Sequence, residues 1–109
     1  MQEIGFFSLK NEGAFDVYLE AVYSINGGPN VRVGPTTGLG YPVNKSSTAD
    51  LGKLGVPNGS VVSVYAIVVA GHNDQAKEQY VFQEGSSVTA SYKITGITIS
   101  PHLHLLSVE

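Results

Sequence analysis

The sequence contains no cysteine and no tryptophan, and it has a single methionine. Without cysteine, the protein has no disulfide bonds, no thiol catalysis and no cysteine-ligated metal site. Its stability must come from a hydrophobic core, and 109 residues are enough to build one. We therefore expect one domain covering residues 1–109.

Basic residues are scarce as well. The chain has six lysines and arginines, scattered singly, and a formal charge of −3. Nucleic-acid-binding proteins present a basic stripe to phosphate groups, so we expect no nucleic-acid partner. No apolar run approaches the roughly 20 residues that a membrane-spanning helix needs.

The first residues, Met1–Ile4, include neither the basic segment nor the apolar stretch of a secretory signal. We expect a protein that stays in the cytoplasm or leaves the cell without a signal peptide. Secretion after removal of a leader stays open at this point.

β-Branched residues are plentiful, above all in the apolar run from Val61 to Ala70. Valine and isoleucine favour strands, because their stiff side chains pack well on a pleated surface. Both alternating faces of this run are apolar, which is typical of a central strand covered on both sides. A second copy of the chain could supply one cover, so we predict a homodimer.

Short strand-like runs alternate with turn residues along the whole chain, and helix signals are nearly absent. This pattern predicts an all-β fold, a single-domain antiparallel β-sandwich of about seven to nine strands, Ig-like or jelly-roll-like, with essentially no helix. The expected strands are 3–10, 15–25, 30–33, 41–45, 60–70, 75–83, 88–94, 97–99 and 102–108.

No catalytic motif is present. A Gly-x-Ser-x-Gly nucleophile elbow is missing, and the glycines of residues 34–40 are followed by neither a Lys-Ser/Thr pair nor a helix. Asp16 and Glu20 share one strand face about 13 Å apart, farther than the pair in a glycosidase. We expect no enzyme activity and no cofactor.

His102 and His104 lie two residues apart, so they point to the same side of a strand. A zinc or copper site needs a third and usually a fourth ligand, and the only other histidine is His72. We expect these side chains to face solvent and predict no metal site.

The candidate ligand-binding residues are polar or aromatic side chains on predicted loops and on one exposed sheet face. Loops on a rigid scaffold often carry binding residues, and a tyrosine ring offers a flat stacking surface. Tyr80 also looks exposed from the pattern. The predicted site comprises Tyr18, Thr36, Thr37, Tyr41, His72, Asn73 and Asp74.

In its low charge and abundant hydroxyl groups, the chain resembles small cysteine-free β-sandwich lectins. The resemblance implies a non-catalytic module that binds a carbohydrate or another cell-surface ligand. Two alternatives stay open. Phe6-Phe7, the loop aromatics and the acidic character are similar to aegerolysin-type proteins, which implies a membrane or lipid partner, ranked here below the lectin. The doubly apolar strand also suits a self-assembling structural subunit.

Overall fold

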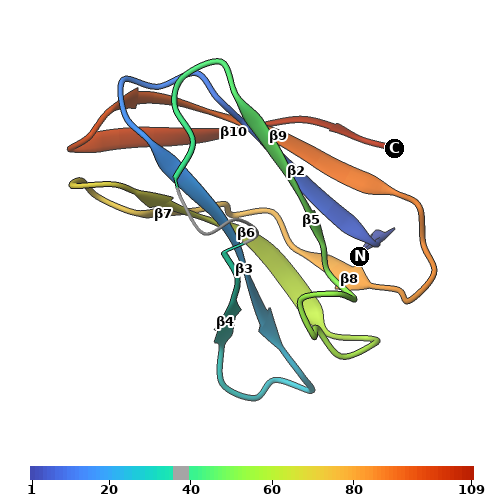
Figure 1. Ribbon diagram of the computed structural model, residues 1–109. Helices are drawn as coiled ribbons and strands as arrows, with labels where there is room; N and C mark the ends of the chain where they lie inside the picture. Colours follow the sequence, from blue (N-terminus) through green and yellow to red (C-terminus); the bar gives the residue numbers. More distant parts are fainter. Residues whose placement is uncertain (36–39) are drawn as a thin grey trace.

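A computed structural model describes residues 1–35 and 40–109 of the protein. The described residues form ten strands and no helix, and the strands make two sheets packed face to face (Figure 1). The predicted all-β sandwich is therefore confirmed, with slightly more strands than expected. A helix able to cross a membrane is not found in this part of the chain.

The first sheet has β6 at its centre, as the apolar run predicts, and its strand order is β1-β8-β6-β3-β4, with β7 also paired to β6. The strands of this sheet are β1 (Glu3–Ile4), β3 (Val17–Ser24), β4 (Val31–Val33), β6 (Val61–Val68), β7 (Asp74–Gln75) and β8 (Tyr80–Phe82).

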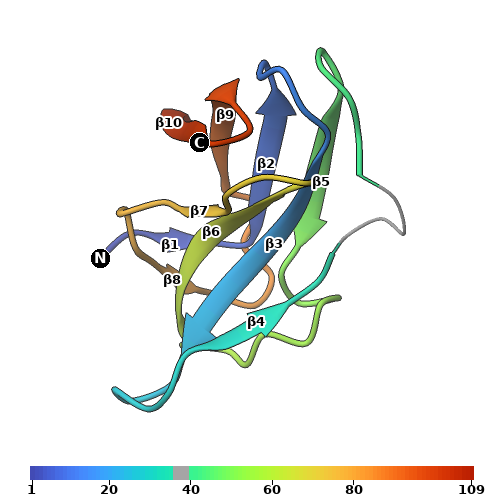
Figure 2. The ribbon, with the colours of Figure 1, turned by 90° about the vertical axis from the view of Figure 1, so that its left-hand side faces the viewer.

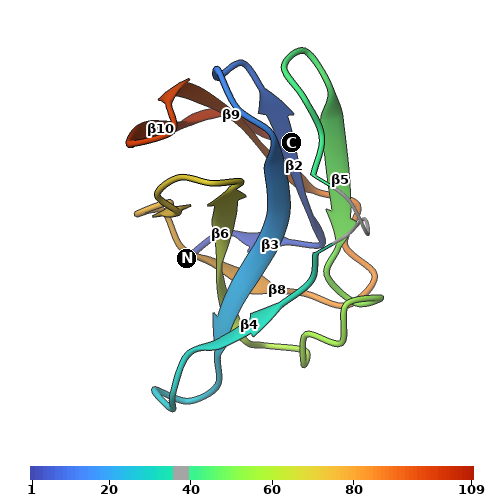
Figure 3. The same ribbon diagram turned by 60° about the vertical axis from the view of Figure 1, so that its left-hand side comes forward.

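The second sheet has the order β10-β9-β2-β5. Its strands are β2 (Phe6–Asn11), β5 (Ser46–Asp50), β9 (Thr89–Ile97) and β10 (Ser100–Val108). Figures 2 and 3 show this sheet lying across the first, with β2 and β3 joined by a loop at one end of the sandwich.

The chain changes sheets at Gly5, so the expected strand 3–10 is divided into β1 and β2. A side chain at Gly5 would collide with the carbonyl oxygen of Ser86, which explains why glycine stands at this crossing. As a result β1 runs parallel to β8, and β2 runs parallel to β9. The sandwich is thus mixed, and the expectation that all its strands are antiparallel is wrong.

The expected strand at 41–45 is reduced to one bridge between Tyr41 and Val17, and the strand forms later, at β5. Only Ala49 in β5 is buried, so the segment lacks the apolar alternation that marks a strand in the sequence. Its pairing with β2 identifies it as an edge strand.

The core is formed by alternating side chains from the inner faces of both sheets. Phe7 contacts the rings of Tyr80 and Tyr92 edge-on, at centroid distances of 5.8 and 6.2 Å. The hydroxyl groups of these tyrosines are hydrogen-bonded to one another at 2.8 Å. Tyr80 is therefore buried, and the prediction that it is exposed is wrong.

The outer face of β6 is covered by the chain's own side chains. The Arg32 guanidinium lies over the Tyr65 ring at 4.9 Å, and the Gln75 amide donates a hydrogen bond to the Ser63 hydroxyl at 2.9 Å. Ser63 is buried and Tyr65 half-buried as a result. A second copy is not needed to cover β6, so the observation that suggested a homodimer is removed.

Candidate functional site

Four loops meet at one end of the sandwich, on the left of Figure 1 and away from both termini. They are the β2–β3 loop (12–16), the residues before β5 (40–45), the β6–β7 loop (69–73) and the tip of the β9–β10 hairpin (98–99). We call this the four-loop end. Backbone hydrogen bonds join these loops, so their side chains form one surface.

Exposed apolar side chains gather at the four-loop end. Ile97 is 54 % exposed and Ile99 67 % exposed, on either side of Thr98 at the hairpin tip. Val69 in the neighbouring loop is 41 % exposed, and Val43 is 50 % exposed. Single exposed apolar residues are ordinary on a protein surface, but a group of them on adjoining loops commonly marks an interaction site.

The β6–β7 loop holds the hairpin tip in place. The backbone N–H of His72 donates to the carbonyl of Thr98 at 2.7 Å, and Gly71 allows this approach because any side chain there would collide with the same carbonyl. Further along, the Asp74 carboxylate accepts a hydrogen bond from the backbone N–H of Leu103 in β10 at 3.1 Å. The apolar tip is thus tied to both sheets.

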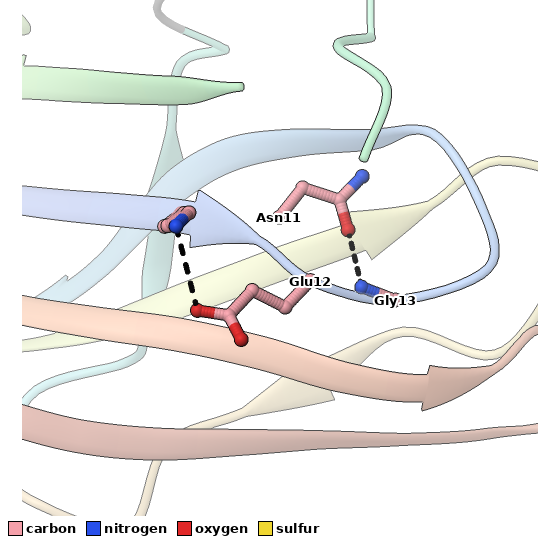
Figure 4. A network of polar contacts seen from close by, with 4 residues as sticks. Asn11, Glu12 and Gly13 are labelled. Carbon is pink, nitrogen blue, oxygen red and sulfur yellow. Dashed lines mark hydrogen bonds and ion pairs between the residues drawn. The ribbon is translucent and has the colours of Figure 1, made fainter. Parts of the chain in front are cut away.

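Asn11 organises the loops on the other side of this end. Its side chain is fully buried and donates to the carbonyls of Phe15 at 2.6 Å and Tyr41 at 3.0 Å. Its oxygen accepts from the backbone N–H of Gly13 at 2.9 Å, the contact drawn in Figure 4. Asn11 thus joins the end of β2 to the β2–β3 loop and to the segment at Tyr41.

The described members of the predicted ligand site lie at the four-loop end. Most of their polar atoms, however, form hydrogen bonds within the protein. The Tyr41 hydroxyl donates to the carbonyl of Leu9 at 2.9 Å. The Asn73 oxygen accepts from the backbone N–H of Val68 at 3.1 Å, and Asp74 binds β10 as described above. Burial raises the pKa of Tyr41 above its ordinary value, as expected for a hydroxyl that is withdrawn from solvent.

Tyr18 and His72 are the remaining described members. Tyr18 is half-buried, and its ring and Val69 both lie against the backbone of Gly40. His72 has an exposed side chain. Thr36 and Thr37 lie outside the described residues. Ile97 and Ile99 are not among the predicted site residues, although they are the most exposed apolar side chains of the described residues at this end.

The two histidines of β10 lie side by side on the outer face of the second sheet, as predicted. The Nε2 atom of His104 is 2.9 Å from the Thr95 hydroxyl, and that of His102 is 3.2 Å from the Ser100 hydroxyl. In the described part of the chain, no three His, Asp or Glu side chains are grouped so that they could hold a metal ion.

A shallow cleft of about 360 Å³ lies at the opposite end of the sandwich. It is lined by Phe6, Phe82, Asp50, Lys53 and Glu84, together with small residues. It is separate from the four-loop end.

Neither a protein-family model nor a curated protein matches the chain in sequence. Solved structures do match it in fold. Listeriolysin O aligns over 96 % of this chain with a TM-score of 0.53 and 12 % identity, and intermedilysin, solved with human CD59, with 0.51 and 11 %. The chain covers 22 % and 24 % of these two proteins, respectively.

The membrane-binding domain of pneumolysin, solved on its own, aligns over 94 % of this chain and 96 % of its own length, but its TM-score of 0.47 is too low to carry an argument. The matches to listeriolysin O and intermedilysin establish a shared fold with part of two lysins.

The lectin-like prediction is wrong. The folds that match are those of lysins, and the hydroxyl and amide groups expected to bind a sugar are bonded within the protein. The prediction of a carbohydrate partner is therefore wrong as well, and the homodimer predicted from the apolar run Val61–Ala70 loses its basis.

Proposed function

We propose that this protein is a non-catalytic membrane-binding domain that inserts the apolar side chains of the four-loop end into a lipid bilayer. The observation that carries the proposal is the pair Ile97 and Ile99, exposed at a hairpin tip that is fixed to both sheets. The shared fold with part of listeriolysin O and of intermedilysin supports it.

The physical argument is one of burial. Removing a large aliphatic side chain from water contributes about 2 kcal/mol. Ile97, Ile99 and Val69 together therefore supply several kcal/mol, enough for reversible attachment to a bilayer surface. Because the hairpin is already held by His72 and Asp74, little ordering is needed on binding, and less of this free energy is lost.

Other exposed apolar residues provide the matched control. Ile25 is 45 % exposed and lies in the β3–β4 loop at the other end of the sandwich. A substitution there removes exposed apolar surface of the same residue type, somewhat less than at Ile97 or Ile99, without touching the four-loop end. If vesicle binding came from non-specific hydrophobic contact over the whole surface, a substitution at Ile25 would weaken it as much as one at Ile97 or Ile99.

The test is co-sedimentation with phosphatidylcholine vesicles, prepared with and without cholesterol. Wild-type protein should sediment with at least one of the two preparations. The Ile97→Ser/Ile99→Ser double variant should bind at least tenfold more weakly to it, while Ile25→Ser should bind like the wild type. Equal binding by all three proteins, or no binding by the wild type, would exclude the proposal.

A further inference from the structure

The outer face of the second sheet carries a row of positive and ionisable side chains close to the four-loop end. Lys10 in β2 is in register with Lys93 in β9, and Lys93 is in register with His104 in β10. His102 lies one outward-facing position nearer the tip, opposite Thr95. We call Lys10, Lys93, His102 and His104 the basic row.

The basic row is notable because this acidic chain has only six lysines and arginines. Like charges directly opposite one another on a sheet destabilise it, and Lys10 and Lys93 are such a pair. Lys10 has a partial counter-charge, because its Nζ lies 3.8 Å from a carboxylate oxygen of the exposed Glu12 (Figure 4). In the described part of the chain no acidic side chain pairs with Lys93.

Hydroxyl groups continue the same face away from the tip. Ser8 of β2 is in register with Thr48 of β5 and with Ser91 of β9, and Ser91 is in register with Ser107 of β10. The outer face therefore combines ammonium groups with hydroxyl groups. This combination suits phosphate and carboxylate oxygens, which accept hydrogen bonds from both.

The position of the row fits a membrane surface. Lys93 and Ile97 lie four residues apart in β9, a span of about 13 Å. The polar headgroup region lies directly outside the hydrocarbon core. Suppose that the tip enters the hydrocarbon core and that the domain leans over, so that the outer face of its second sheet approaches the bilayer surface. The lysine side chains of the basic row would then lie among the headgroups. Asp16, exposed in the β2–β3 loop, belongs to the side of the first sheet, which this tilt turns away.

We infer that the basic row binds anionic phospholipid headgroups and orients the inserted domain. This inference rests on the proposed membrane binding. A lysine near an anionic bilayer strengthens binding roughly fivefold. The effect is electrostatic, so it weakens as salt shortens the Debye length from about 10 Å at 0.1 M to about 3 Å at 1 M.

The experiment measures the affinity of the protein for two kinds of vesicle. The first is the neutral phosphatidylcholine preparation used in the co-sedimentation test, and the second has part of its phosphatidylcholine replaced by phosphatidylserine. At low salt the wild type should bind the anionic vesicles roughly tenfold or more tightly. Lys10→Gln/Lys93→Gln should lose most of this gain and keep its affinity for neutral vesicles. The matched control is Lys53→Gln/Lys77→Gln, which removes the same charge away from the outer face of the second sheet.

The outcomes separate the two proposals. Binding to neutral vesicles without a gain from phosphatidylserine would overturn the inference and leave the proposed function standing. An equal loss in the control variant would also overturn the inference, because net charge alone would then explain the gain. Binding only to anionic vesicles, lost in Lys10→Gln/Lys93→Gln, would support the basic row and contradict apolar insertion. No binding to either vesicle would contradict both proposals.

Discussion

The backbone N–H of His72 donates to the carbonyl oxygen of Thr98 at 2.7 Å, which joins the β6–β7 loop of one sheet to the hairpin tip of the other. This bond fixes the most exposed apolar residue of the hairpin, Ile99, in a defined place. Exposed apolar residues that are grouped on a fixed hairpin tip are typical of an interaction site, whereas single exposed apolar residues are not.

Gly71→Ala should destabilise the protein by about 1–3 kcal/mol, the usual cost of overpacking a close contact. The new methyl group would collide with the Thr98 carbonyl and force the loop and the hairpin apart. Urea unfolding measures the loss of stability, and amide exchange at His72 should become faster. Gly52→Ala is the control, because a methyl group there meets only ordinary contacts. Equal stability of the two variants would contradict this account of the joint.

Asn11→Ala should cost about 2–3 kcal/mol, because a buried side chain with three hydrogen bonds is lost and its backbone partners are left unsatisfied. The β2–β3 loop and the segment at Tyr41 should loosen together, which amide exchange can follow. Asn30→Ala, an exposed position in the β3–β4 loop, should change little. If Asn11→Ala were as mild as this control, the role given to Asn11 would be wrong.

Alkaline pH should destabilise the fold. Burial raises the pKa values of Tyr41, Tyr80 and Tyr92 above the ordinary value near 10, so the folded protein keeps protons that the unfolded chain releases. The stabilisation is fully present below pH 10 and is lost as pH rises from there toward the folded pKa values.

Urea unfolding at intervals between pH 8 and pH 11 tests this, with the free energy of unfolding level at first and then falling. Tyr92→Phe removes one of the three groups, so its decline should be shallower. Its stability at pH 8 should be lower by about 1–2 kcal/mol, because the hydrogen bonds to Tyr80 and Glu78 are lost. A free energy that stays level up to pH 11 would contradict the account.

Arg32→Ala should destabilise the protein through Glu20. The Glu20 side chain is only 8 % exposed, and its Oε1 atom lies 3.1 Å from Nε of Arg32 with no hydrogen bond of its own. Because Arg32 is itself half-exposed, we expect a cost of about 2 kcal/mol, less than for a fully buried pair. In a Glu20→Gln background the same substitution should cost clearly less. Equal costs in both backgrounds would show that Arg32 acts only by packing on Tyr65.

The main strands could be predicted from the sequence, because their patterns are strong. The apolar run at β6 and the alternation of β3 both place a buried face correctly. β5 could not be found in this way, since Ala49 is its only buried residue. In β10, Leu105 alternates with His102 and His104 but is 41 % exposed, at the point where the pairing of β10 with β9 shifts register between Leu105 and Ser107.

The site was predicted less well, for a physical reason. The predicted site consists mainly of polar groups on loops, but Asn73, Asp74 and Tyr41 use their polar groups in hydrogen bonds that stabilise the fold. Ile97-Thr98-Ile99 has the alternation of a strand, and only the hairpin turn at Thr98 and Ile99 makes it a tip. The one signal of an irregularity in the sequence is Gly96, which precedes this segment and adopts a φ of 102° in the structure.

The central claim is that Ile99 enters the lipid bilayer, and the absence of cysteine makes a direct measurement possible. A single cysteine introduced as Ile99→Cys can carry an environment-sensitive fluorophore, and Ile25→Cys serves as the matched control. On addition of vesicles that bind the wild type, the emission of the probe at residue 99 should shift to the blue and be quenched by lipids labelled in the acyl chain, while the probe at residue 25 should not respond. A probe at residue 99 that stays in water while the protein is bound, or an equal response at both positions, would contradict the account.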